Sequence, residues 1–165
     1  MCCRHAQVLN NMCGITGFFI DPAVDKSFVP DVCLQAMNEA LVHRGPDDSG
    51  YWFDKGSGLG LAHRRLSIID TSRAGQQPML SSSGRFRVVF NGEIYNHVEI
   101  RKEIEAAKDI NWRSTSDTET LLESVELWGL EASVAKFVGM FAIALWDQEE
   151  KTLSLIRDRM GEKPL

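Results

Sequence analysis

The sequence predicts a single α+β domain whose sheets are largely antiparallel. Short strand-like runs come in groups, and the two clearest helical stretches follow one another as a pair, so strict βαβ alternation is absent. The chain has 165 residues, of which 44% are apolar and 25% charged. This length and composition are typical of a globular domain that is long enough to bury a core.

The first predicted elements are a strand and a helix. Residues 14–20 form a short apolar run bounded by Gly and Asp-Pro, which predicts a buried strand. Pro30 suits the first turn of a helix, and the breaker His-Arg-Gly-Pro at 43–46 ends it. The apolar residues at helical spacing between them are Val32, Leu34, Met37, Ala40 and Leu41.

Further strands and two helices are predicted from the middle of the chain to its end. The strands before the helices are expected at 51–53, 59–63, 66–69 and 86–90. Asn96 followed by Glu99 predicts the cap of a helix that ends at Ala107. Ser116 with Glu119 forms a capping box for a helix that ends at Trp128. The last strands, 140–146 and 152–156, are expected to form a hairpin across 148–151.

Several classes of protein are excluded by what the sequence lacks. No apolar run approaches the roughly 18–20 residues of a membrane helix, and the first residues have no apolar signal core. A net charge of −5 with interspersed signs gives no basic patch for nucleic acid or an anionic membrane. Neither a GxxxxGK[ST] nor a GxGxxG loop occurs, so no nucleotide is expected to bind here. We expect a cytoplasmic protein.

The cysteines are expected to be thiols in a reducing compartment and not disulfides. Cys33 lies in the apolar helical stretch and is interpreted as a small core residue. Cys2, Cys3 and His5 lack a second ligand pair at finger-like spacing, so no metal site is predicted.

Cys13 has a different context, because it follows Met12 directly and opens the first strand. If translation starts at Met12 and that residue is removed, Cys13 carries a free α-amine with a pKa of about 7.7–8.0. Such an amine can take the proton of a thiol with a pKa of about 8.5, so one residue supplies both nucleophile and base. The alternative is a buried strand residue in a chain that starts at Met1. Local sequence leaves both open.

The dipeptide Asn91-Gly92 also has two interpretations. Between apolar runs, Asn-Gly is the strongest short-range signal for a hairpin turn. The side-chain amide and the Gly N–H can instead face a developing oxyanion, and a tight turn would hold them in place. Both interpretations can hold at once.

Charged residues supply candidate groups for binding an amino acid. Arg65 follows Arg64 in strand-like sequence, and it either lies at an exposed edge or forks onto a ligand carboxylate. The negative charge of Asp117 interacts favourably with the dipole of its helix. Like Glu93, Asp117 could instead bind an ammonium group. A Cys-His pair formed with His43, His63 or His97 is the alternative to the amine base, although structural roles are favoured for His43 and His63.

Eight ordered segments resemble the class II (N-terminal-nucleophile) glutamine amidotransferases, within them the asparagine synthetase branch. They are MCGITGFF, HRGPDDSG, AHRRLSIID, QQPM, VVFNGEIYNH, SDTE, GMFAIALWD and RDRMGEKPL, and they cover nearly everything from residue 12 to 165. The resemblance implies a four-layer αββα sandwich of the N-terminal-nucleophile hydrolase type, incomplete at the C-terminus.

The resemblance also implies a role for each site residue. Cys13 would attack the γ-carboxamide of glutamine, release ammonia and form a thioester that water hydrolyses, with Asn91 and Gly92 as the oxyanion hole. Arg65 would hold the α-carboxylate of glutamine. The remaining residues would bind the α-amino group (Glu93 and Asp117) or line the pocket through their backbone (Leu66, Ser67, Ile68 and Ile69).

Two departures from the family pattern shape the expected domain organisation. Residues 1–12 are interpreted as an extension with a mis-assigned start, or as a leader, ahead of a truncated glutaminase domain at 13–165. An ATP-dependent synthetase domain, with its ATP and magnesium, is expected elsewhere in a larger protein, which could form a homodimer. Aspartate is the expected ammonia acceptor. The alternatives are another carboxylate, such as a surface-polysaccharide precursor, or a catalytically inactive binding or regulatory module.

Overall fold

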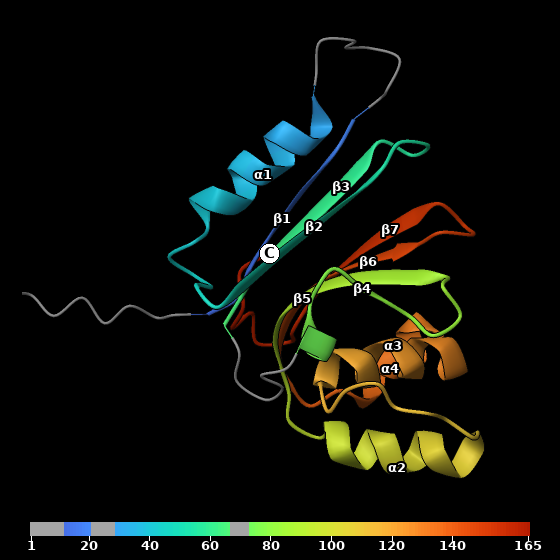
Figure 1. The fold of residues 1–165 in the computed structure, drawn as a ribbon. Coiled ribbons are helices and arrows are strands. Elements are labelled where there is room, and N and C mark those ends of the chain that lie inside the picture. The colour runs from blue at the N-terminus through green and yellow to red at the C-terminus, as the bar shows by residue number, and fades with distance from the viewer. Residues whose placement is uncertain (1–11, 21–28, 67–72) are drawn as a thin grey trace, which may run out of the picture.

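The protein consists of four layers in the order helix, sheet, sheet, helices (Figure 1). The computed structural model describes residues 12–20, 29–66 and 73–165. Every strand pair in both sheets is antiparallel. The predicted α+β class and αββα layering are therefore confirmed.

The first sheet has three strands in the order β1-β3-β2, with bounds β1 Gly14–Phe19, β2 Asp48–Asp54 and β3 Leu59–Arg65. Helix α1, Pro30–Ala40, packs on this sheet. The prediction that the first strand is buried was wrong, since Phe19 is 63% exposed. The reason is that β1 is an edge strand, which sequence hydrophobicity alone does not reveal.

The second sheet has the order β4-β5-β6-β7. Its bounds are β4 Met79–Leu80, β5 Phe86–Ile94, β6 Gly139–Asp147 and β7 Thr152–Arg157, and the short 3₁₀ helix η1, Arg73–Gly75, precedes β4. The predicted β6–β7 hairpin is confirmed. The predicted turn at Asn91-Gly92 was wrong, because β5 continues through both residues and pairs with β6 as far as Ile94.

Three helices cover the outer face of the second sheet: α2 His97–Ala107, α3 Asp117–Trp128 and α4 Leu130–Lys136. The cap of α3 is confirmed in part, since Ser116 Oγ accepts from Thr118 N at 3.0 Å. Glu119 does not complete the capping box, because it accepts from the N–H groups of Arg113 and Ser114 instead.

The other helix boundary signals had mixed outcomes. Asn96 occupies the N-cap position of α2, but its side chain bonds the backbone of Lys136 and Val138 and caps nothing in α2. Helix α4 was not predicted. It is separated from α3 by Gly129, whose φ of +80° is a conformation that favours glycine.

The packing of the two sheets differs. The larger hydrophobic core lies between the second sheet and its helices, and it includes Ile100, Ile104, Leu121, Leu122, Phe137 and Phe141. A smaller cluster lies between the sheets and consists of Leu59, Leu61, Val89, Ala144 and Trp146. Cys33 is only half-buried in α1, with its sulfur 3.8 Å from Met37 Sδ.

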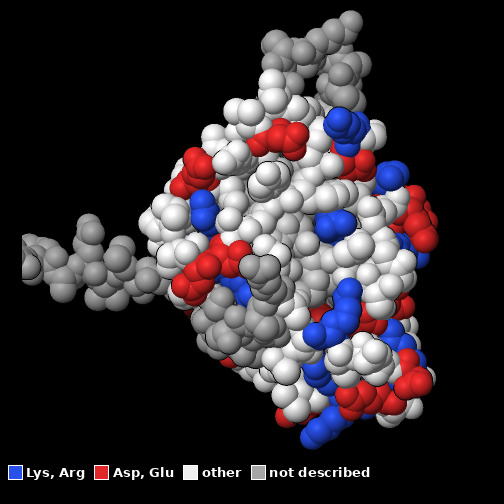
Figure 2. Space-filling view, viewed as in Figure 1, with Lys and Arg blue, Asp and Glu red and all other residues white. Residues whose placement is uncertain are grey.

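The surface seen in Figure 2 carries acidic and basic side chains interspersed, with no large area of one sign. Among the described residues, no helix has both the length and the apolar character needed to cross a membrane.

Candidate active site

Cys13 lies directly before β1, next to the end of β3. Its Sγ is 3.3 Å from the backbone N–H of Leu66, which donates to it, and 3.6 Å from the Leu66 carbonyl. The pairing of Gly14 with Arg64 explains this contact, because it brings the residue before β1 to the residues that follow Arg64. The thiol is thus fixed from both sides by one backbone unit.

A small polar hollow of about 60 Å³ opens beside Cys13. Among its lining residues are six that the sequence predicted as site residues: Cys13, Arg65, Leu66, Gly92, Glu93 and Asp117. The hollow also has lining residues that sequence reasoning did not assign to a substrate, namely His63, Gly75, Gln77, Phe90, Ser116 and Thr118. The fold therefore brings together residues that lie more than 100 positions apart.

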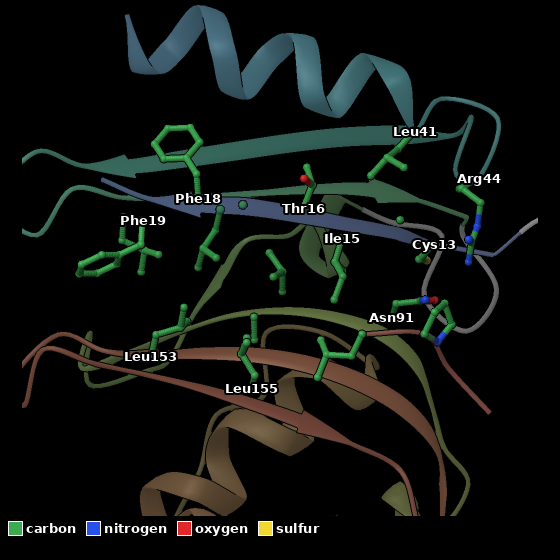
Figure 3. Close-up of a pocket in the computed structure, with 18 residues that line it drawn as sticks. Cys13, Ile15, Thr16, Phe18, Phe19, Leu41, Arg44, Asn91, Leu153 and Leu155 are labelled. Atoms are coloured by element: carbon green, nitrogen blue, oxygen red, sulfur yellow. The ribbon is translucent and has the colours of Figure 1, made fainter. Parts of the chain in front are cut away.

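Cys13 also lies at one end of a larger apolar cleft of about 470 Å³ between the two sheets (Figure 3). Asn91 lines this cleft near Cys13, whereas Phe19, Leu153 and Leu155 line it farther along β1 and β7. Asn91 therefore lines the cleft, whereas Gly92 lines the polar hollow. The sulfur of Cys13 lies where the two hollows meet.

The surroundings of Cys13 favour the neutral thiol over the thiolate. Burial raises the pKa of the Cys13 thiol above its ordinary value, although the Leu66 N–H and the positive charge of Arg65 lower it. A thiol in this state needs a base to become a nucleophile.

Arg65 is buried, with 8% of its surface exposed, so the interpretation as an exposed edge residue was wrong. Its guanidinium lies against η1: a Cβ on Gly75 would come within 2.2 Å of Arg65 Nη2. A larger residue at position 75 would require the guanidinium to shift. Arg64 points elsewhere and donates from Nε to the carbonyl of Asn38 at 3.0 Å.

Asp117 is buried at the first turn of α3, where its Oδ2 accepts from the N–H of Ile94 at 3.0 Å. Burial raises the pKa of Asp117 to about 6, against the lowering effect of the N–H groups of Ile94 and Thr118; the nearby Glu93 raises the pKa further. A positively charged ligand group beside Asp117 would therefore stabilise the carboxylate and offset the cost of burying its charge.

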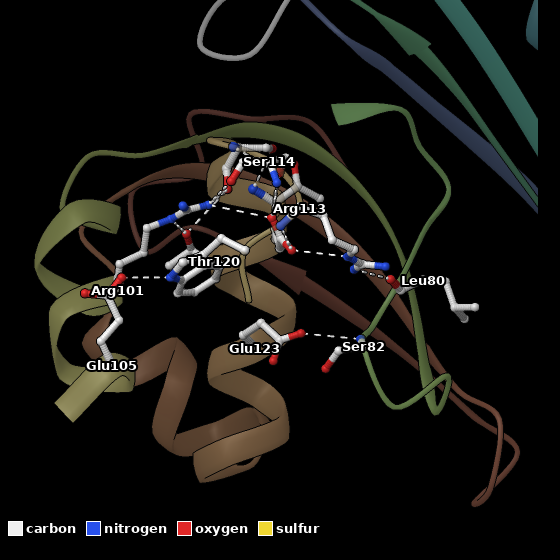
Figure 4. Close-up of polar contacts among 12 residues, drawn as sticks. Leu80, Ser82, Arg101, Glu105, Arg113, Ser114, Thr120 and Glu123 are labelled. Carbon is white, nitrogen blue, oxygen red and sulfur yellow. Dashed lines mark hydrogen bonds and ion pairs between the residues drawn. The ribbon is translucent and has the colours of Figure 1, made fainter. Parts of the chain in front are cut away.

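A polar network fixes the segment that leads into Asp117 (Figure 4). Arg101 of α2 donates to the carbonyls of Ser114 and Ser116 at 2.9 and 3.0 Å. Glu119 accepts from the N–H groups of Arg113 and Ser114 at 3.0 and 2.7 Å. Because these bonds hold the chain just before α3, they set the position of Asp117 relative to the hollow.

Gly92 turns its backbone N–H toward the hollow. Its partner in β6 is Phe141. The N–H of Phe141 donates to Asp158 Oδ2 at 3.1 Å and its carbonyl accepts from Asp158 N at 2.8 Å, so both backbone groups point away from β5. In an antiparallel pair the opposite residue then faces away as well. A Cβ on Gly92 would lie 2.1 Å from the Met140 carbonyl oxygen, so this position requires glycine.

Of the three candidate histidines, one lines the polar hollow. His63 lines the hollow, but it is buried and donates from Nε2 to the Phe90 carbonyl at 3.1 Å; burial lowers the pKa of His63 to about 4, which keeps it neutral. His43 and His97 are not among the residues that line the hollow. The geometry favours a structural role for His63.

Some predicted residues cannot be compared with the structure. Ser67, Ile68 and Ile69 lie outside the described residues, as do Cys2, Cys3 and His5. Within the ranges 12–20, 29–66 and 73–165, no group of three or more His, Cys, Asp or Glu side chains could hold a metal ion.

Comparison with known proteins shows the family to which the chain belongs. The model of the glutamine amidotransferase domain family matches residues 12–165. The chain belongs to this family. Asparagine synthetase [glutamine-hydrolyzing] 1 of Bacillus subtilis is 40% identical over 154 residues, which is 93% of this chain and 24% of that protein. Amidase chry2 of Gibberella zeae is 35% identical, again over 93% of this chain and 24% of that protein.

A solved structure supports the fold of this amidotransferase domain. Glutamine phosphoribosylpyrophosphate amidotransferase from B. subtilis, solved with ADP and GMP, superposes with a TM-score of 0.61 at 17% identity, covering 87% of this chain and 36% of the other. At this identity the similarity concerns the fold alone. The domain spans about a quarter of the length of the curated relatives it matches.

Proposed function

We propose that this domain hydrolyses glutamine to glutamate and ammonia, with Cys13 as the nucleophile. The observation that carries the proposal is the hollow itself, in which Cys13 meets the cation Arg65, the acids Glu93 and Asp117, and the N–H of Gly92. Opposite charges within one small hollow suit the α-carboxylate and α-ammonium groups of an amino acid. The thiol beside them is then available to the side chain of that amino acid.

The α-amine of Cys13, free once Met12 is removed, acts as the base. It accepts the thiol proton, and the sulfur attacks the carboxamide carbon of glutamine to form a tetrahedral intermediate. The Asn91 amide and the Gly92 N–H stabilise its oxyanion. The protonated amine then gives its proton to the leaving nitrogen, so ammonia departs and a γ-glutamyl thioester remains. Water, deprotonated by the same amine, hydrolyses the thioester to glutamate.

The wider activity follows from the relatives, which are named glutamine-hydrolysing asparagine synthetases. Ammonia would pass to an ATP-dependent synthetase domain of the same protein, with ATP and magnesium bound there, and amidate aspartate. The fungal relative named an amidase shows that similar domains occur in proteins under another name, so a different carboxylate acceptor is the competing proposal. We further propose that the protein is cytoplasmic and forms a homodimer.

The test compares the gene product translated from Met12 with the product translated from Met1, each extended to the natural end of the gene. Release of glutamate and ammonia from glutamine is measured, with Cys13→Ser as the matched control. Activity is expected from the product that begins at Cys13 after removal of Met12, and it should be lost in the control. A folded, correctly processed protein without glutaminase activity would favour the inactive binding module. Activity that survives a blocked N-terminus would favour a Cys-His mechanism.

A further inference from the structure

Strand β5 has an open edge where it borders the polar hollow. On one side it pairs with β6 along its whole length; on the other side the described residues pair with it as a strand only at Arg87 and Val88, through β4. The N–H and C=O groups of successive strand residues point to alternate sides of the strand. Those of Phe90, Gly92 and Ile94 therefore point to the same side as those of Val88, toward the hollow. Buried backbone groups without a partner are costly, so this edge needs hydrogen-bond partners other than a strand.

Side chains replace the missing strand at the two residues that flank Gly92. The N–H of Phe90 donates to Gln77 Oε1 at 2.6 Å, and the N–H of Ile94 donates to Asp117 Oδ2 at 3.0 Å. The Phe90 carbonyl accepts from His63 Nε2 at 3.1 Å. Gly92 lies between these two held residues, with its N–H toward the hollow.

Gln77 connects this edge to the helix that carries Asp117. While Oε1 accepts from Phe90, Nε2 donates to Thr118 Oγ1 at 3.2 Å. The residue is 6% exposed, and its own carbonyl lies so close to β2 that a Cβ on Gly50 would be 2.1 Å from it. One carboxamide thus joins the strand of the oxyanion donors to the residue next to Asp117.

We propose that Gln77 is a positioning residue, whose carboxamide sets both the Gly92 N–H and the Asp117 carboxylate relative to Cys13. The proposal rests on the proposed glutaminase activity. Its two hydrogen bonds act on different groups: the bond to Phe90 aligns the oxyanion donor, and the bond to Thr118 aligns the group that binds the α-ammonium. Breaking them separately should therefore alter different kinetic constants.

The first variant is Gln77→Met, which keeps the length of the side chain and removes both hydrogen bonds. We expect kcat for glutamine hydrolysis to fall about 10- to 100-fold, because small misplacements of a reacting group have effects of that order. The matched control is Gln76→Met. Gln76 is exposed, bonds Asp48 and Ser49, and does not line the hollow, so its kcat should be unchanged.

The second variant is Thr118→Val, which retains the bond from Phe90 to Gln77 and removes the bond to α3. We expect KM for glutamine to rise several-fold with kcat within about twofold of the wild type, since a positioning effect on ground-state binding changes KM alone. A merely structural role would lower the amount of folded enzyme without separating the two constants. If Gln77→Met does not fold, Thr118→Val still tests the role of Gln77 at Asp117.

The experiment uses the full-length protein processed to Cys13, with circular dichroism to verify folding. A wild-type protein without glutaminase activity would overturn the proposed function itself. If the wild type is active, a folded Gln77→Met with wild-type kcat overturns the role at Gly92. A folded Thr118→Val with unchanged KM overturns the role at Asp117.

Discussion

The two sheets contribute different chemistry and are packed to different extents. The second sheet and its three helices enclose the larger core, whereas the first sheet has a single helix and shares only a small cluster with the second. Cys13 directly precedes β1 and Arg65 ends β3 of the first sheet. Asn91, Gly92 and Glu93 lie on β5 of the second, and Asp117 begins a helix on it. The nucleophile is thus presented from the less covered side to groups fixed by the better packed side.

Each side of the site therefore supplies groups both for binding and for chemistry. Asn91 and Asp117 are held within sheet and helix hydrogen bonds, so replacing them should leave most of the packing intact. Within the described ranges the Cys13 sulfur bonds only the backbone of Leu66, and Cys13 lines both hollows. The predictions below test whether each half has the role that its position suggests.

The largest effect is expected from Cys13→Ala in the first sheet. Glutamine hydrolysis should fall by roughly 10³-fold or more, because no other group can form the thioester. The thermal midpoint should change little, since Cys13 is only partly buried. Steady-state kinetics and a melting curve measure both quantities. A variant that retains more than about a tenth of the activity would contradict the assignment of Cys13.

The next effect is expected from Asn91→Ala in the second sheet. Loss of one oxyanion donor should lower kcat by about 10²–10³-fold, with a small change in KM. The measurement is kcat at saturating glutamine. A decrease smaller than tenfold would show that Asn91 serves the strand and not the oxyanion.

Arg65→Lys should have a smaller effect, and on binding. A point charge replaces the planar fork, so KM for glutamine should rise by about tenfold, the equivalent of one lost charge-assisted hydrogen bond. Arg64→Lys is the matched control, because Arg64 bonds Asn38 and does not line the hollow. An unchanged KM in Arg65→Lys would remove Arg65 from the site.

The smallest effect is a pH dependence. Because burial raises the pKa of Asp117 to about 6, this carboxyl group is neutral below that pH and cannot pair with an α-ammonium. KM for glutamine should therefore rise as the pH falls through about 6, by up to tenfold per pH unit. Asp117→Asn should have a higher KM at neutral pH and lose this dependence. A wild-type KM that is constant between about pH 5 and 7 would count against the role of Asp117.

Local signals predicted those parts of the fold that depend on neighbouring residues. The hairpin of β6 and β7 and the Ser116 cap are of this kind, since turn residues and a capping oxygen act within a few positions. Asn91-Gly92 has an equally strong local signal for a turn, but pairing with β6 overrides it. The few residues around a turn signal do not encode the register of a strand with a distant partner.

The site was predictable residue by residue only where the family resemblance named a role. Arg65 is buried and lies against Gly75, and no periodic pattern links those positions. Gln77 was missed because its importance comes from the short β4, which leaves the edge of β5 open. A glutamine before a proline gives no sign of this. The roles of Asn91, Gly92, Glu93 and Asp117 in catalysis remain predictions.

The most direct test of the central claim is peptide mass spectrometry of the full-length protein, translated from Met12, after incubation with a diazo-ketone analogue of glutamine. The account predicts one adduct, on the thiol of an N-terminal Cys13 from which Met12 has been removed. That result would identify the nucleophile and the free α-amine together. A folded protein with no adduct, or with the adduct on another residue, would contradict the account.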